Sequence, residues 1–114
     1  MARDDAYLVD ILDAAKLALA YVSDKTKAEF DRDIQCQDAV IRRLEIIGEA
    51  ARRVTEQTRA KFPLLPWNAM MNMRNVLIHE YDDVDLPIVW DTVRNDLPPL
   101  IAELKKIVPP EELA

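Results

Sequence analysis

The chain has 114 residues, of which 50% are hydrophobic and 32% are charged, and its formal net charge is −6. This length suits one domain, and a single glycine is too few for a strand-rich fold or a glycine-rich phosphate loop, so we expect residues 1–114 to form one helical domain. The acidic balance argues against non-specific coating of DNA, the single cysteine fits a cytoplasmic protein, and no apolar run reaches the ~20 residues that span a membrane.

The spacing of apolar residues predicts two long helices in the first half of the chain, over residues 5–22 and 33–54. Ser23 and Asp24 interrupt the first pattern and are expected to cap a short turn before the second helix. Gly48 falls inside the second helix, where glycine costs roughly 0.5–1 kcal/mol relative to alanine. We expect this glycine to allow a close approach of another helix, because it has no side chain to separate the two backbones.

Prolines organise the second half of the chain. A polar connector with a short helix over residues 56–61 leads to a third helix, expected from Pro66 to about His79. Asp85 is a suitable N-cap for the fourth helix. Pro98 and Pro99 fall inside the apolar run of this helix and predict a kink near residues 95–98, or two helices placed end to end. The expected fold class is therefore all-α, an antiparallel up-down bundle of four to five helices.

The end of the third helix carries the most informative side chains. Arg74 offers a planar fork of donors that suits a phosphate, and His79 is the only histidine of the chain and transfers a proton near neutral pH. Together they predict chemistry on a phosphodiester, with RNA as the natural substrate. Asn75 and His79 share a helix face, whereas Arg74 and Tyr81 lie off that face of an ideal helix. We therefore expect the helix to end near His79.

This segment resembles the HEPN superfamily and, within it, the HepT family, whose pattern is arginine, four residues, histidine, any residue and tyrosine. Arg74, His79 and Tyr81 match that pattern, and Asn75 stands at the polar position after the arginine. The resemblance extends over most of the chain through Ile46-Ile47-Gly48-Glu49-Ala50, Pro66-Trp67, Met73-Arg74-Asn75, Val84-Asp85-Leu86 and Trp90.

The resemblance implies a HEPN-like helical domain with the activity of a metal-independent RNA endonuclease, without a cofactor, that acts as a toxin. Arg74 and His79 would be catalytic and Asn75 supporting. The implied partner is an MntA-type nucleotidyltransferase, an antitoxin that silences the toxin by transferring AMP onto Tyr81. One histidine does not easily act as acid and base at once, so we expect a homodimer with a composite active site.

Each of these features also has a plain structural reading. Arg74 could pair with an acidic neighbour, and Tyr81 could rest on the core with its hydroxyl in water. The acidic residues at positions 82, 83 and 85 are more typical of helix caps than of a metal site. Met70, Met71 and Met73 are expected to fill gaps in the core, with an adaptable contact surface as the other reading. Cys36 reads as a packing residue.

The alternative function is a non-catalytic helical dimer that binds a nucleotidyltransferase and presents nucleotide or substrate to it. A purely structural bundle is the third reading. The presence of Arg74, His79 and Tyr81 together favours the enzyme, because a binding-only protein has no reason to carry all three at this spacing and a structural bundle explains none of them.

Overall fold

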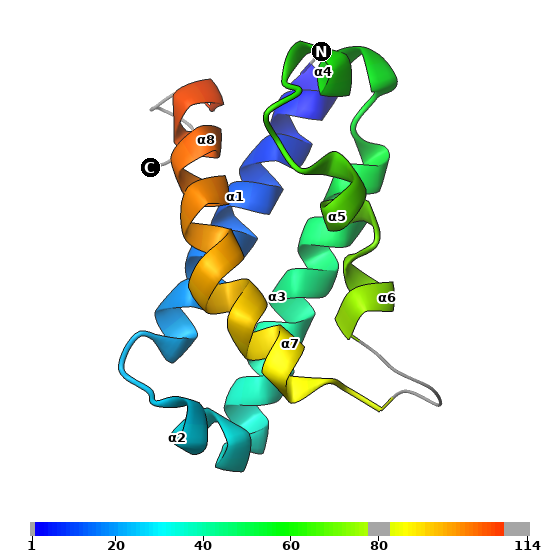
Figure 1. The fold of residues 1–114 in the computed structure, drawn as a ribbon. Coiled ribbons are helices and arrows are strands. Elements are labelled where there is room, and N and C mark those ends of the chain that lie inside the picture. The colour runs from blue at the N-terminus through cyan, green and yellow to red at the C-terminus, as the bar shows by residue number, and fades with distance from the viewer. Residues whose placement is uncertain (1, 78–82, 109–114) are drawn as a thin grey trace.

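The computed structural model of the chain describes residues 2–77 and 83–108, and every regular element in these ranges is helical. Successive long segments run in opposite directions, so the predicted all-α up-down bundle is confirmed (Figure 1). Among the described residues, no helix is both long and apolar enough to cross a membrane. The helices are α1 (Ala2–Val22), α2 (Lys27–Arg32), α3 (Ile34–Arg53), α4 (Glu56–Lys61), α5 (Trp67–Met71), α6 (Met73–Leu77), α7 (Leu86–Asp91), the π-helical segment η2 (Thr92–Asp96) and α8 (Leu97–Ile107).

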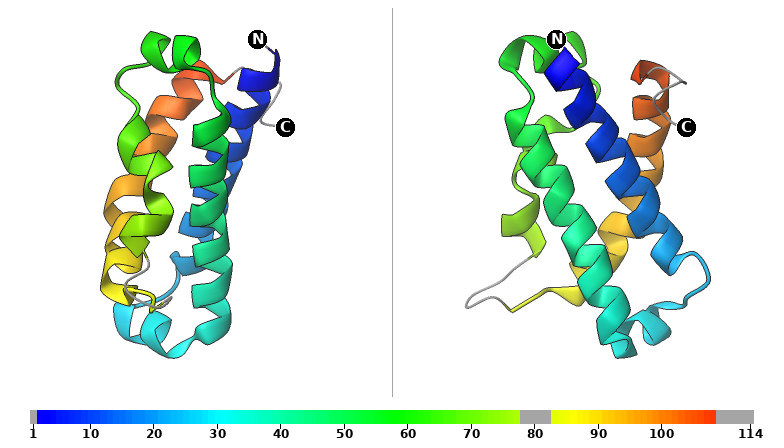
Figure 2. Two further views of the ribbon diagram at one scale, coloured as in Figure 1. Left: turned by 90° about the vertical axis from the view of Figure 1, so that its right-hand side faces the viewer. Right: turned by 180° about the vertical axis from the view of Figure 1, so that it is seen from behind.

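The centre of the fold is the pair α1 and α3, which lie side by side along their length (Figure 2). Helix α8 packs against α1, and the short helices α5 and α6 pack against α3. Apolar side chains of all these helices meet in one core, as the helical spacing of the sequence predicts. The largest fully buried members are Leu8, Ile11, Leu12, Val22, Phe30, Val40, Leu44, Ile47, Met70, Leu97 and Leu104.

The start of α1 is held by a buried carboxylate. Asp4 is 2% exposed and accepts hydrogen bonds of 2.6 Å from the hydroxyls of Thr55 and Thr58, at the start of α4. These bonds, that from Thr55 first, hold the pKa of the Asp4 carboxyl below its ordinary value. This tertiary anchor explains why α1 begins at Ala2, before the limit expected from the apolar spacing.

The corner between α1 and α3 differs from the prediction. Thr26, and not Ser23 or Asp24, caps α2, through a capping box in which Thr26 and Glu29 exchange side-chain and backbone hydrogen bonds. The hydroxyl of Ser23 instead donates to the carbonyl of Ala20 at the end of α1.

The last long segment is interrupted near the prolines, which confirms the predicted kink. Asp85 caps its start by accepting from the Ile88 amide at 3.1 Å, as expected. The backbone then widens into η2, where the Leu97 amide donates to the carbonyl of Thr92, five residues back. Helix α8 restarts with Pro98 in its first turn, a position where the missing N–H is not needed. The kink therefore combines a π-helical turn with a proline restart.

Candidate functional site

Helix α6 carries Arg74 and Asn75, which are both exposed. The predicted continuous third helix is wrong at Asn72, where the chain breaks into α5 and α6. The amide of Asn72 is shared between the carbonyls of Asn68 and Met70, so the helical hydrogen-bond pattern tightens at this point.

Helix α3 holds this break in place. The Nε of Arg52 donates to the carbonyl oxygen of Met71 at 2.9 Å, a charge-assisted bond from the long helix to the last residue of α5. In an uninterrupted helix that oxygen would face the amide four residues further on. A side chain of α3 therefore takes over part of the hydrogen bonding at the junction between α5 and α6.

Gly48 allows this contact between helices. A Cβ atom built at Gly48 would lie 3.0 Å from the carbonyl oxygen of Met70 and 3.4 Å from the Cβ of Met73. The first distance is shorter than real Cβ contacts tolerate without displacement of the neighbour. The expectation that Gly48 serves a close helix approach is confirmed, and the approaching elements are α5 and α6.

The guanidinium of Arg74 lies beside a carboxylate of α3. Its Nη1 is 3.6 Å from Oε2 of Glu45, and the two side chains are 59% and 26% exposed. The acidic neighbour anticipated for Arg74 is therefore present, and it orients the arginine without covering it. Sequence reasoning did not single out Glu45. The available signal was its position three residues before Gly48, on the side of α3 that receives α6.

Glu45 belongs to a charged face of α3. Arg42, Glu45, Glu49 and Arg52 follow one another at spacings of three, four and three residues, which places them on one side of a helix. Arg42 and Glu49 form an ion pair of 3.5 Å. Glu45 contacts Arg74 of α6, and Arg52 donates to the carbonyl of Met71 at the end of α5. Asp38, exposed four residues before Arg42 on the same side of α3, brings the carboxylates to three against three guanidinium groups, so this surface carries charges of both signs.

The other two residues of the predicted motif, His79 and Tyr81, lie outside the described residues. The described part of α6 runs to Leu77, and the description resumes at Asp83. Helices α6 and α7 are in contact, so the two ends of this interval are brought to the same side of the bundle (Figure 1). The expected end of the helix near His79 also falls in this interval.

Three carboxylates follow the motif, and two of them lie in the described part of the chain. Asp82 lies outside the described residues, Asp83 is exposed, and Asp85 has the capping role that was predicted for it. Within the described ranges, no group of three or more histidine, cysteine, aspartate or glutamate side chains is arranged to hold a metal ion. The described geometry of Asp85 is therefore explained by helix capping.

Cys36 and the methionines have structural surroundings. Cys36 is buried, and its thiol lies 3.6 Å from the carbonyl of Tyr21, while burial raises the pKa of the thiol. Met70 and Met73 are 1% and 7% exposed, which confirms core packing for these two, whereas Met71 is half-buried.

The chain is similar in sequence to proteins named as ribonucleases. The family model described as "Ribonuclease HepT-like" matches residues 11–107. A protein of Methanocaldococcus jannaschii named "Gamma-glutamylcyclotransferase and putative RNase" is 43% identical over 94% of this chain and 47% of its own length. A "Putative RNase" of the same organism is 41% identical over 90% of this chain and 85% of its own length. "Probable ribonuclease HepT" of Thermococcus cleftensis is 39% identical over 89% of this chain and 92% of its own length.

The chain thus spans about half the length of the first of these relatives and most of the length of the other two. No solved structure matches the chain.

Proposed function

Because the chain belongs to the HepT-like ribonuclease family, we propose that it is a metal-independent RNA endonuclease in which Arg74 and His79 act on a phosphodiester. The observation that supports the proposal is the exposure of Arg74 beside Glu45. Its guanidinium is oriented by Glu45 at 3.6 Å and its side chain is nevertheless 59% exposed, so a phosphate can reach it from solvent. His79 enters through its place in the sequence motif.

The chemistry uses a nucleophile that RNA itself supplies. The 2′-oxygen bonds to phosphorus while the bond from phosphorus to the 5′-oxygen breaks, which yields a 2′,3′-cyclic phosphate and a 5′-hydroxyl. A base takes the proton of the 2′-hydroxyl, and an acid protonates the leaving oxygen. A fixed cation stabilises the added charge on the five-coordinate phosphorus. We assign the cation to Arg74, proton transfer to His79 and a supporting contact to the exposed Asn75 beside Arg74.

Two proton-transfer groups are needed, and the chain has one histidine. We therefore assign the second group to another copy of the chain, in a homodimer whose composite site contains two copies of Arg74 and His79. The exposed guanidinium groups of Arg42 and Arg74 supply cations on one copy, and the second copy supplies the same set to an RNA strand that passes between them.

In the cell we propose that this activity is that of a toxin, paired with an MntA-type nucleotidyltransferase as its antitoxin. Transfer of AMP to Tyr81 would place bulk and negative charge two residues from His79. The added phosphate would compete with the RNA phosphate for the same cation and would thereby silence cleavage.

The test is incubation of an RNA oligonucleotide with the purified chain in excess chelator. We expect wild type to produce 2′,3′-cyclic phosphate ends, and His79→Ala and Arg74→Ala to cut roughly 10²–10⁴-fold more slowly. Arg53→Ala, which removes another exposed arginine, is the matched control and keeps the wild-type rate. Tyr81→Phe is expected to cut RNA and to escape silencing by the partner.

Two results would overturn this assignment. Equal cleavage by wild type and His79→Ala would assign the activity to another site or to a contaminant. A pure wild-type chain that makes no cut but binds a nucleotidyltransferase would establish the alternative, a non-catalytic dimer that presents nucleotide or substrate.

A further inference from the structure

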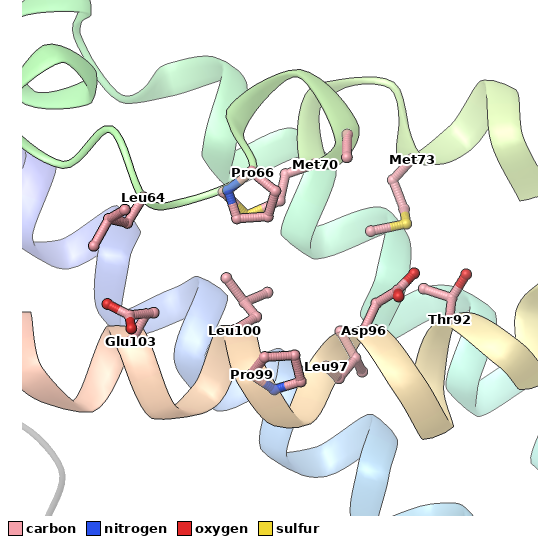
Figure 3. Close-up of a pocket in the computed structure, with 11 residues that line it drawn as sticks. Leu64, Pro66, Met70, Met73, Thr92, Asp96, Leu97, Pro99, Leu100 and Glu103 are labelled. Carbon is pink, nitrogen blue, oxygen red and sulfur yellow. The ribbon is translucent and has the colours of Figure 1, made fainter.

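A groove lies between the segment Leu64–Met73 and the segment formed by η2 and α8 (Figure 3). Its volume is about 450 Å³, within the range of natural binding pockets. It arises because α5 and α6 pack on α3, whereas α8 packs on α1, so the two outer segments diverge in front of the central pair. Met73 lines the groove, and the next residue of α6, Arg74, makes the contact with Glu45 that defines the proposed catalytic surface.

The lining of the groove is largely apolar. Met70, Leu97 and Leu100 form the inner wall and are 1%, 1% and 4% exposed. At one end stands Leu64, which is 80% exposed and is the most exposed large apolar side chain in the described part of the protein. A prominent leucine beside an apolar groove is typical of a surface that a partner covers.

The two charged residues that line the groove are both acidic. Asp96 and Glu103 stand on the wall formed by η2 and α8, and Figure 3 shows them at opposite ends of the groove, facing Met73 and Leu64. They are seven residues apart, which is about 10 Å along a helix. None of the described lining residues is a lysine or an arginine. Glu103 forms an exposed ion pair of 3.2 Å with Lys106, whereas the structure gives Asp96 no ion pair among the described residues.

We propose that this groove docks a basic amphipathic helix of a partner protein. Two turns of such a helix present apolar side chains at positions i, i+4 and i+7, which suit the length and the apolar wall of the groove. Lysine or arginine side chains spaced seven residues apart on that helix then meet Asp96 and Glu103. RNA is disfavoured as the occupant, because the two carboxylates repel its phosphates.

Docking at this place has a consequence for the proposed catalytic surface. Met73 lines the groove and Arg74 is the next residue of the same short helix. A helix in the groove therefore contacts the element that carries Arg74. The docking proposal does not depend on RNA cleavage, and binding is measured independently of activity.

The test uses the full chain labelled with ¹³C in its methionine methyl groups. The probe is a synthetic 15-residue helical peptide with leucines at i, i+4 and i+7 and lysines seven residues apart. We expect the methyl signals of Met70 and Met73 to shift on titration, whereas that of Met71, which does not line the groove, stays in place. A peptide of the same composition in scrambled order is expected to bind at least tenfold more weakly, because it lacks the apolar stripe.

Charge reversal tests the rim. Asp96→Lys is expected to weaken binding of the lysine peptide roughly fivefold to tenfold at low salt, and to strengthen binding of a peptide with glutamates in place of the lysines. Asp91→Lys is the matched control, because Asp91 is exposed on α7 and does not line the groove, and it leaves the affinity within about twofold. Circular dichroism checks that both variants are folded.

Four outcomes would overturn the proposal. Equal binding of the two peptide orders would remove the requirement for an amphipathic helix. Shifts at Met71 in place of Met70 and Met73 would put the peptide elsewhere. Shifts of Met70 and Met73 that depend on protein concentration without peptide would identify a second copy as the occupant, and competition by an RNA oligonucleotide would identify RNA.

Discussion

The α1–α3 pair and the α5–α6 segment are held in the fold by different forces. Helices α1 and α3 have 21 and 20 residues and share a continuous apolar contact, with Leu12 and Leu44 among its fully buried members. Helices α5 and α6 have five residues each, too short to be stable by themselves, and depend on α3 for their position. The bundle is thus stabilised by buried area, whereas the helix that carries Arg74 is positioned by a few close contacts.

Helix α3 serves both regions through adjacent faces. Leu44 and Ile47 are fully buried on the face toward α1, whereas Glu45, Gly48 and Arg52 face α5 and α6. A substitution on the first face should lower the stability of the whole bundle. A substitution on the second face should displace the α5–α6 segment, and the following variants separate the two effects.

The largest effect is expected for Gly48→Val. Its Cβ would press on the carbonyl of Met70 at 3.0 Å, and the γ-carbons would add to the overlap. We expect a loss of about 1–3 kcal/mol in the free energy of unfolding from overpacking, measured by urea denaturation. In methyl NMR, Met70 and Met73 should shift while the α1–α3 core keeps its signals.

Gly48→Ala and Asp38→Val complete this comparison. Alanine gains about 1 kcal/mol of helix propensity, which offsets part of the overlap, so Gly48→Ala should be milder. Asp38→Val places the same β-branched side chain at an exposed position of α3 and measures its cost without the overlap. Equal stability of Gly48→Val and Asp38→Val would show that α5 does not depend on the close approach.

A smaller, pH-dependent effect is expected for Asp4→Asn, which tests the anchor between α1 and α4. Hydrogen bonds from Thr55 and Thr58 lower the pKa of Asp4 in the folded state below its unfolded value of about 3.9. The carboxylate therefore contributes stability above pH 4, and that contribution is lost as the pH falls through the folded pKa. Wild type should be more stable than Asp4→Asn at pH 7, and the difference should shrink by pH 3.

Urea unfolding of both proteins at the two pH values gives this difference. Asp13→Asn, on the exposed side of the same helix, is the control and should show little change at either pH. If wild type and Asp4→Asn differ as much in unfolding free energy at pH 3 as at pH 7, the anchor does not depend on the charge of Asp4.

The smallest effect on stability is expected for Glu45→Ala, because exposed ion pairs contribute little, and the unfolding free energy should change by less than about 0.5 kcal/mol. If Arg74 acts on RNA as proposed, cleavage should nevertheless fall about tenfold, because the guanidinium loses its orientation. Glu49→Ala removes the carboxylate that pairs with Arg42 and is the matched control. Faster cleavage by Glu45→Ala would mean that Glu45 competes with the phosphate and does not position Arg74.

Much of the fold was predictable from local sequence signals. The short helix over residues 56–61, the limits of α3, the Asp85 cap and the interruption near Pro98 are all confirmed, because each depends on a cap, a proline or an apolar stripe within one segment. The break at Asn72 was missed, because the group that stabilises it, Arg52, lies 20 residues earlier in the sequence. The anchor of Asp4 was missed for the same reason, since its donors lie on α4.

For the candidate site, the sequence by itself determined which side chains are available: one histidine, an arginine five residues before it and a tyrosine two residues after it. It also determined the family, because the pattern and its flanking segments are local in the chain. The tertiary structure decided that Arg74 lies against Glu45 and that a groove with an acidic rim opens behind Met73. Both features depend on the packing of α5 and α6 against α3 and on their separation from α8. Contacts between segments that are distant in the sequence follow from helix packing and leave no pattern within a single segment.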